Sequence, residues 1–304
     1  MAARAESFAW WSIAVGLAVL ALKLAAWGVT GGAALFSDAA ETTVNVATAV
    51  MTVATLLWAA RPADAGHNYG HGKAEFFAAV IEGVLIVVAA LLILQHAWEV
   101  WRHAMPLKRP GVGLLLTAVA TGLNAVWARL LIQNGTRIRS PALVADGRHI
   151  LSDVVTSAGV FAGVALVVAT GLRWLDPLVG ALAAAMVLAS GFHLIRASVG
   201  GLLDAAPSEE VRLRIRAALA AILEEEAGIA QSDVFEVHDL RVRQAGRTAF
   251  MEFHLVVPGG MSVSQAHRIC DRMEAALKAE MGDLRVTIHV EPEEKAKHSG
   301  VVVL

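Results

Sequence analysis

The stretch Phe76–Trp98, FFAAVIEGVLIVVAALLILQHAW, decides the fold class, because it is a long apolar run whose single charged residue is Glu82. A helix needs about 20 consecutive, predominantly apolar residues to cross the hydrocarbon core of a bilayer. Such runs predict an integral membrane α-helical protein with six transmembrane helices. The other five runs are Phe8–Gly28, Thr42–Ala60, Gly111–Ala128, Val154–Leu172 and Pro177–Ile195.

The composition supports a membrane protein with a soluble portion. Of the 304 residues, 57% are hydrophobic and 17% are charged, whereas soluble domains are about 45–50% apolar and about 25% charged. These values exclude a disordered chain and a basic nucleic-acid-binding protein, so no nucleic-acid partner is expected. Cys270 is the single cysteine and cannot form an internal disulfide, which excludes a disulfide-framed secreted module.

The distribution of charge predicts the orientation and the domain boundaries. An even number of spans places both termini on one side, and the excess of basic residues on that side predicts that both termini are cytoplasmic. Residues 1–204 hold 13 of the 25 basic and 11 of the 27 acidic residues, so they carry a net +2, and the remainder carries −4. We therefore expect a membrane domain over 1–204, a cytoplasmic domain over 205–293, and a flexible tail over 294–304.

After Pro207 the pattern becomes that of a soluble α+β domain. Ser208 is suited to cap a helix, since the acids Glu209 and Glu210 follow it in the first turn. A Gly-containing turn separates two β-like runs, as in a hairpin. The predicted order is αββαβ, with helices over Val211–Glu226 and Ser264–Glu280 and strands over Phe235–Val242, Ala249–Val257 and Leu284–Val290.

Two of the predicted spans carry matching polar faces. The spacing i, i+3, i+7 places three polar residues on one side of a helix, and ionisable groups at membrane depth normally face the bundle interior. A polar packing network, or residues at the water interface, would give a similar pattern. Two matching acidic faces, one with a histidine, favour a cation site. We expect the second and fifth helices to begin a turn or two before their apolar cores. The residues are Asp38, Glu41 and Asn45 in the second helix, and Asp146, His149 and Asp153 in the fifth.

Two further clusters of metal-ligating residue types lie outside the spans. Asp64, His67 and His71 fall within eight residues of a short loop; a carboxylate with two imidazoles suits zinc or a similar divalent metal. A polar turn with incidental histidines is the alternative. The cytoplasmic domain holds four histidines and a nearby acid, which favours metal binding over satisfied structural histidines. These residues are His238, His254, His267, His289 and Glu291.

Several motifs occur in an order that resembles the cation diffusion facilitator family. The resemblance covers nearly the whole chain and includes the six spans and the αββαβ domain. The matching stretches are Arg61–Asp64, His67–Glu75, Ala145–Asp153, Val237–Arg241 and Ile288–Pro292. The resemblance implies a homodimeric efflux carrier, not an enzyme, that exchanges a divalent metal for protons. It implies a bacterial inner (cell) membrane protein with cytoplasmic N- and C-termini.

The resemblance also implies the residues of each metal site. Asp38 and Asp146 are additional candidates on the same helix faces. The implied transport site is Glu41, Asn45, His149 and Asp153; the loop site is Asp64, His67 and His71; the cytoplasmic sites are His238, His254, His267, His289 and Glu291.

The transport site departs from that of well-known zinc members of the family. Those members have Asp or His where this chain has Glu41, and Asp where it has Asn45. Glu291 stands where Asp is common. The N and O ligands favour Zn²⁺ as substrate, with Fe²⁺, Mn²⁺, Co²⁺ and Ni²⁺ as alternatives. Asp38, rather than Asn45, is the alternative fourth ligand.

Other classes of protein fit the sequence less well. A membrane-anchored metal sensor without transport would need no polar face inside the membrane. An intramembrane hydrolase would use an HExxH pair or a nucleophile in a span, and the sequence contains no HExxH. An ATP-driven pump would carry a GxxxxGK[ST] or DKTG motif, and neither is present.

Overall fold

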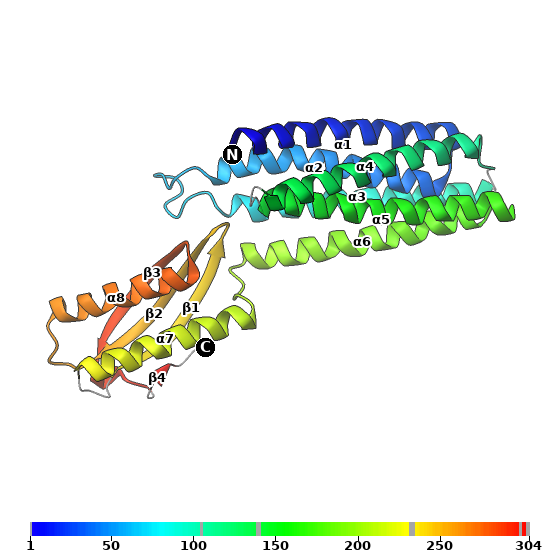
Figure 1. Cartoon of the computed structure of the whole chain (residues 1–304). Helices are drawn as coiled ribbons and strands as arrows, with labels where there is room; N and C mark the ends of the chain where they lie inside the picture. The colour runs from blue at the N-terminus through cyan, green and yellow to red at the C-terminus, as the bar shows by residue number, and fades with distance from the viewer. Residues whose placement is uncertain (1, 104–105, 138–140, 231–234, 298–299, 302–304) are drawn as a thin grey trace. The chain divides into compact units, whose positions relative to one another are not determined.

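The computed structural model describes residues 2–103, 106–137, 141–230, 235–297 and 300–301 (Figure 1). The chain forms two compact units. The first unit is made of residues 1–54 and 78–196, and the second of residues 55–77 and 197–304. Residues 55–77, which we expected to belong with the spans, therefore group with the C-terminal part of the chain.

Six helices are long and apolar enough to cross a membrane within the described residues, which confirms the prediction of six spans. Each is longer than its predicted apolar core, because helices continue through polar residues beyond the hydrocarbon layer. The helices are α1 (Ala2–Thr30), α2 (Ala33–Ala59), α3 (Ala74–His103), α4 (Pro110–Arg137), α5 (Pro141–Thr170) and α6 (Leu175–Leu202).

Small residues bring helices of the first unit close together. A Cβ atom added to Gly83 of α3 would lie 3.1 Å from the carbonyl oxygen of Gly191 of α6, and one added to Gly191 would lie 3.1 Å from the carbonyl oxygen of Gly83. Close backbone approach at small residues is how helices pack in a bilayer, where burial of apolar side chains gives no net gain over lipid. In the same unit, α4 packs against α1 and α5.

The C-terminal domain has the predicted αββαβ order and one additional strand. Its four-stranded sheet has the order β3-β2-β1-β4, in which β1 and β2 are antiparallel and the other two pairs are parallel. The elements are α7 (Glu209–Ala230), β1 (Glu236–Ala245), β2 (Thr248–Val257), α8 (Val263–Met281), β3 (Leu284–Pro292), the 3₁₀ turn η1 (Glu293–Lys295) and β4 (Gly300–Val301).

Part of the segment 294–304, which we expected to be a flexible tail, has regular secondary structure. Residues 293–295 form η1, and Gly300 and Val301 pair in parallel with Glu236 and Val237 of β1. Residues 298–299 and 302–304 lie outside the described part of the chain. The sequence pattern could not predict this short strand, because two paired residues are too few to show the alternation of a strand.

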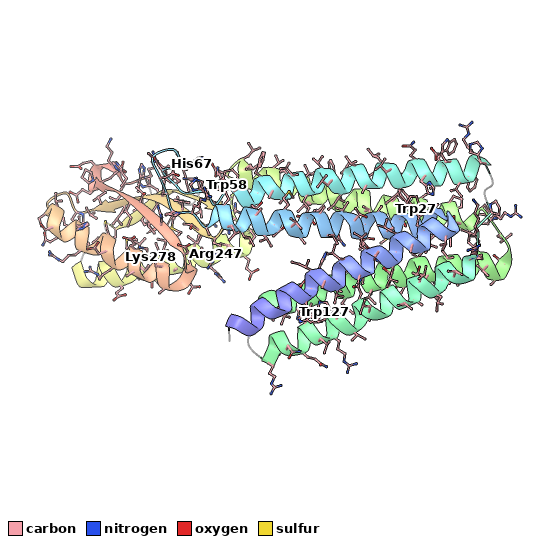
Figure 2. All side chains as sticks on the ribbon, turned by 90° about the horizontal axis from the view of Figure 1, so that it is seen from above. Trp27, Trp58, His67, Trp127, Arg247 and Lys278 are labelled. Carbon is pink, nitrogen blue, oxygen red and sulfur yellow. The ribbon has the colours of Figure 1, made fainter. Side chains whose placement is uncertain are left out.

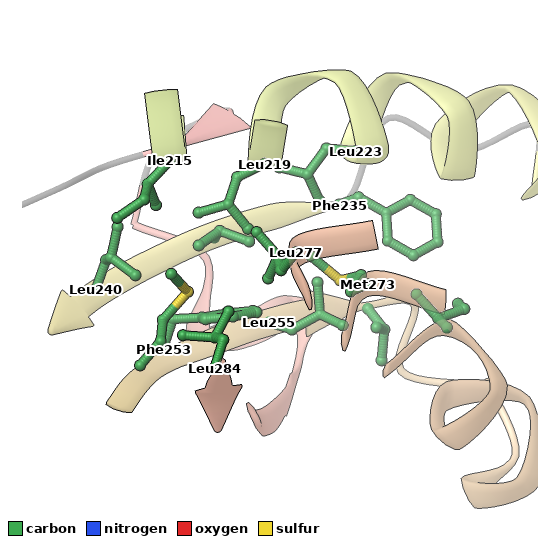
Figure 3. Close-up of a cluster of buried hydrophobic side chains, with 14 residues drawn as sticks. Ile215, Leu219, Leu223, Phe235, Leu240, Phe253, Leu255, Met273, Leu277 and Leu284 are labelled. Carbon is green, nitrogen blue, oxygen red and sulfur yellow. The ribbon is translucent and has the colours of Figure 1, made fainter. Parts of the chain in front are cut away.

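The core of this domain lies between one face of the sheet and the two helices (Figure 3). Alternation along β2 turns Phe253 and Leu255 toward the helices and leaves His254 on the other face. The helix side chains that meet the sheet are completely or almost completely buried. They include Ile215 and Leu219 of α7 and Met273 and Leu277 of α8.

Two local backbone features shape β1. Gly246 has φ +61° at the first central position of a two-residue turn, and Ala245 pairs with Thr248 across it; glycine at this position is the requirement of a type II′ hairpin turn. The pairing register of β1 with β2 shifts between His238 and Arg241, and Asp239 there has φ +53°. Such a bulge changes the direction of a side chain relative to the regular alternation.

Candidate metal sites

The first candidate site lies between α2 and α5 in the membrane unit. The side-chain amide of Asn45 donates a hydrogen bond to Oδ2 of Asp153 across 3.1 Å. Glu41, one helical turn before Asn45, interacts electrostatically with Asp153 and with His149. The structure thus joins Asn45 and Asp153 directly and leaves Glu41 and His149 in electrostatic range, but the ligand atoms of Glu41, His149 and Asp153 are not among the convergent groups of the described residues.

Asp38 has a different partner from the one the sequence suggested. The ammonium of Lys23 on α1 lies 2.7 Å from Oδ1 of Asp38 and donates to Oγ1 of Thr42 (2.8 Å) and Oγ of Ser157 (2.8 Å). The Ser157 hydroxyl in turn donates to Oδ1 of Asp38 across 2.7 Å. Lys23 and Asp38 are each only 2% exposed. We call Lys23, Asp38, Thr42 and Ser157 the Lys23 cluster. The sequence did not predict it, because the position of a lysine within a span does not indicate which residue of another helix it contacts.

Asp146 also has a partner outside the candidate site. Its Oδ2 accepts a hydrogen bond from the Ser12 hydroxyl (3.0 Å), and the Ser12 oxygen accepts one from Nε1 of Trp127 (2.9 Å) (Trp127 is labelled in Figure 2). Asp146 therefore joins α5 to α1 and α4. The i, i+3 spacing predicted a common face with His149, but a short side chain near the edge of that face reaches the neighbouring helix instead.

The second candidate site is the loop between α2 and α3. One ligand atom each from Asp64, His67 and His71 lies within 4.8 Å of the others. The carboxylate oxygens of Asp64 are 3.4 Å from Nδ1 of His67 and 3.5 Å from Nε2 of His71 (His67 is labelled in Figure 2). The backbone N–H groups of His67 and Gly66 donate to Oδ1 of Asp64 and hold the pKa of this carboxyl below its ordinary value. Asp64 is therefore a ready anionic ligand.

The loop is anchored on the β1–β2 hairpin of the same unit. The guanidinium of Arg243 lies 4.8 Å from the centre of the Tyr69 ring and 4.5 Å from that of Phe250, and the two rings are 5.4 Å apart. Gly72 adjoins the hairpin so closely that a Cβ atom there would collide with the carbonyl of Ala245. The loop ligands are thus connected directly to the sheet.

The third candidate site is a row of imidazoles on the face of the sheet opposite the helices. Strand register places His238 beside His254 and His254 beside His289, with ring centres 5.2 and 4.8 Å apart. The carboxylate of Glu291 lies close to all three imidazoles. Its oxygens are 3.1 Å from Nε2 of His238, 3.4 Å from Nδ1 of His254 and 3.7 Å from Nε2 of His289.

Two acids that sequence reasoning missed complete this row. Oε1 of Glu236 contacts Nδ1 of His238 (2.9 Å) and accepts a hydrogen bond from the backbone N–H of Lys297 (2.9 Å). Oδ2 of Asp239 lies 3.8 Å from Nδ1 of His254, and the Lys297 ammonium, 2.9 Å away, keeps the pKa of Asp239 below its ordinary value. Glu236 is two residues before His238, so strand alternation places both on the same face, and this spacing could have indicated Glu236. Alternation places Asp239 on the opposite face from His238, and only the bulge turns it toward the imidazoles.

His267 lies apart from the row. It is on α8, its side chain is 75% exposed, and its Nε2 is 3.8 Å from Asp271. Among the described residues, the groups whose ligand atoms converge are Asp64, His67 and His71 in the loop and His238, Asp239 and His254 on the sheet. The structure therefore does not bring His267 together with the other three histidines.

Six apolar spans, a polar site between two of them and an αββαβ domain with a row of imidazoles define a membrane transporter rather than an enzyme. The chain belongs to the cation efflux, or cation diffusion facilitator, family: residues 9–203 match the cation efflux transmembrane domain, and residues 207–293 match the cytoplasmic domain of cation efflux proteins. It is a cation efflux pump of that family, and its C-terminal domain is a cytoplasmic dimerisation domain.

Relatives align along nearly the full chain. An uncharacterized transporter of Synechocystis is 40% identical over 96% of this chain and 92% of its own length. The cation-efflux pump FieF of Shewanella oneidensis is 32% identical over 92% of each chain. The solved metal-bound C-terminal domain of the CzcD transporter from Thermotoga maritima is 27% identical, and the alignment covers 30% of this chain and 100% of that one with a TM-score of 0.24.

The imidazole row generates a prediction for the isolated domain 205–304. Zinc should raise its melting temperature, since a ligand at about 100 times its Kd stabilises the folded state by about 2.7 kcal/mol. His254→Ala removes the central imidazole of the row and should abolish most of this shift. Glu252→Ala, two residues away on the same strand, should keep it. A full zinc response in His254→Ala would show that the row is structural.

The loop generates a separate prediction for transport. Replacing His67 and His71 together by alanine removes both imidazoles but leaves the membrane ligands in place. Zinc flux into proteoliposomes should fall yet stay above about a tenth of the wild-type rate, a barrier change of less than about 1.4 kcal/mol. The exposed neighbour Asn68→Ala is the matched control. Complete loss of flux would contradict a supporting role for the loop.

Proposed function

We propose that this chain is a homodimeric antiporter of the bacterial inner membrane that exports Zn²⁺ in exchange for protons. The observation that carries the proposal is the meeting of α2 and α5 at membrane depth, where the Asn45 amide bonds Asp153 and Glu41 interacts with Asp153 and His149. Fe²⁺, Mn²⁺, Co²⁺ and Ni²⁺ are alternative substrates. The relative named FieF is a cation-efflux pump, in line with this direction of transport.

The exchange follows from the charges of the proposed transport site. Glu41 and Asp153 contribute two negative charges, which cancel the charge of one divalent ion and allow the loaded site to remain in a low dielectric. Once the ion leaves, two bare carboxylates in a membrane pocket are costly. Protons that bind a carboxyl group or His149 remove this cost, so metal and protons compete for the same site.

The two cytoplasmic clusters serve the same metal in other roles. We propose that residues 1–204 contain the transport pathway and that 205–293 bind metal and dimerise. The imidazole row then senses metal on the cytoplasmic side, and the loop site, held on the hairpin by Tyr69 and Arg243, transmits the metal-bound state between the sheet and the ends of α2 and α3. A sensor without transport would not explain the polar contacts of α2 with α5.

Removal of a membrane ligand tests the proposed function directly. His149→Ala and Asp153→Ala should each lower zinc flux by at least about tenfold, while the protein stays folded and dimeric by size-exclusion chromatography. The matched control is Asp146→Asn on the same helix, which should transport normally because Asp146 bonds Ser12 instead of the site. Flux within about twofold of wild type in either alanine variant would refute the site.

Asn45→Asp tests the departure from the zinc members. A carboxylate there would lie where the Asn45 amide now bonds Asp153, at 3.1 Å, so the empty site would hold a third negative charge and bind an additional proton. We expect tighter metal binding at high pH, a steeper loss of affinity as the pH falls, and an altered preference among Zn²⁺, Fe²⁺ and Mn²⁺. The measurement is metal affinity as a function of pH. The same pH slope as wild type would remove Asn45 from the site.

A further inference from the structure

Lys23 is the only lysine or arginine among the described side chains that is buried, with 2% exposure. All its polar contacts are on the two helices that carry the proposed transport site: Asp38 and Thr42 on α2, and Ser157 on α5. A lysine in the interior of a span is expensive and normally pairs with an acid. The contacts of 2.7–2.8 Å satisfy the three donors of the ammonium.

The Lys23 cluster is adjacent to the proposed metal ligands. Asp38 precedes Glu41 by three residues and Ser157 follows Asp153 by four, so the cluster is about one helical turn, or about 5.4 Å, from the ligands along both helices. The electrostatic interactions of Glu41 and of Asp153 each include both Lys23 and Asp38. The charges of the cluster therefore act on the site.

The two charges of the cluster have opposite consequences for a divalent ion. Paired, Lys23 and Asp38 add no net charge, and Glu41 and Asp153 alone balance the ion. Without the ammonium, Asp38 would be a third carboxylate beside the site. Its Oδ2 is buried and has no hydrogen-bond partner in the described part of the structure, so this oxygen would be open to a cation.

We propose that Lys23 is a specificity-determining positioning residue, whose ammonium neutralises Asp38 and keeps this carboxylate out of the metal site. This inference rests on the proposed transport site. The fourth residue of the site is then Asn45, which bonds Asp153, and not Asp38, which pairs with Lys23. The charge of the empty site is then set by Glu41 and Asp153.

The test compares the KM for zinc flux in three variants that remove the charge of Lys23, the charge of Asp38, or both. Lys23→Met leaves Asp38 unpaired, so KM should fall by about tenfold or more, with slower maximal flux because the ion is held more tightly. Asp38→Asn leaves the ammonium unpaired, so KM should rise by about tenfold or more. In the double variant Lys23→Met/Asp38→Asn the two effects should cancel and restore KM to within about threefold of wild type.

A merely structural role predicts a different pattern. Loss of packing would move KM in the same direction in both single variants and would not cancel in the double variant, and either result would overturn the proposal. If the single variants fail to fold, the test uses the charge-preserving variants Lys23→Arg and Asp38→Glu and the neutral double variant, which should all show a near-wild-type KM. A folded double variant that binds no metal would also overturn the proposal. The control is Ser37→Ala, which removes a buried hydroxyl next to Asp38 that donates its hydrogen bond to the Ala34 carbonyl.

The outcome distinguishes this inference from the proposed function. If Asp153→Ala abolishes flux but the two single variants do not shift KM in opposite directions, the transport site stands and only the role of Lys23 is wrong. If Asp153→Ala transports normally, the proposed site itself fails.

Discussion

A charge inside the hydrocarbon layer must have a partner, and this constraint organises the membrane unit. Lys23 and Asp38 form a neutral pair that connects α1 to α2, and Ser157 extends the connection to α5. One turn away, Asn45 and Asp153 join α2 and α5 again. Polar contacts thus join α1, α2 and α5 beside the proposed transport site.

Charged side chains of the imidazole row in the cytoplasmic domain also have partners, although this domain is surrounded by water. Its apolar face is covered by α7 and α8, so the polar face of the sheet is available for ligands. There Glu291 stands between imidazoles of three strands, and Lys297 approaches from the C-terminal segment. Carboxylates among imidazoles offer oxygen and nitrogen ligands to a cation, which supports the proposal that this row binds metal.

The two kinds of site differ in how much charge their surroundings tolerate. Exposed Asp64 and the half-buried Asp239 can remain ionised in contact with water, and local donors keep the pKa of each low. In the membrane, each unpaired charge raises the cost of the empty state. The combination of Glu41 with a neutral Asn45 therefore limits the proposed transport site to two carboxyl groups, Glu41 and Asp153. The third buried acid nearby, Asp38, is paired with Lys23.

The sequence by itself determined the six spans, the αββαβ domain and the family, because long apolar runs, period-two strands and short motifs are local signals. It also indicated which histidines and acids could bind metal. Only the tertiary structure decided which of them meet: Asp38 pairs with Lys23, Asp146 bonds Ser12, the bulge at Asp239 turns this acid toward His254, and His267 lies apart. Helical spacing places a residue on a face, but the neighbouring helix or strand determines its partner, and that neighbour is distant in sequence.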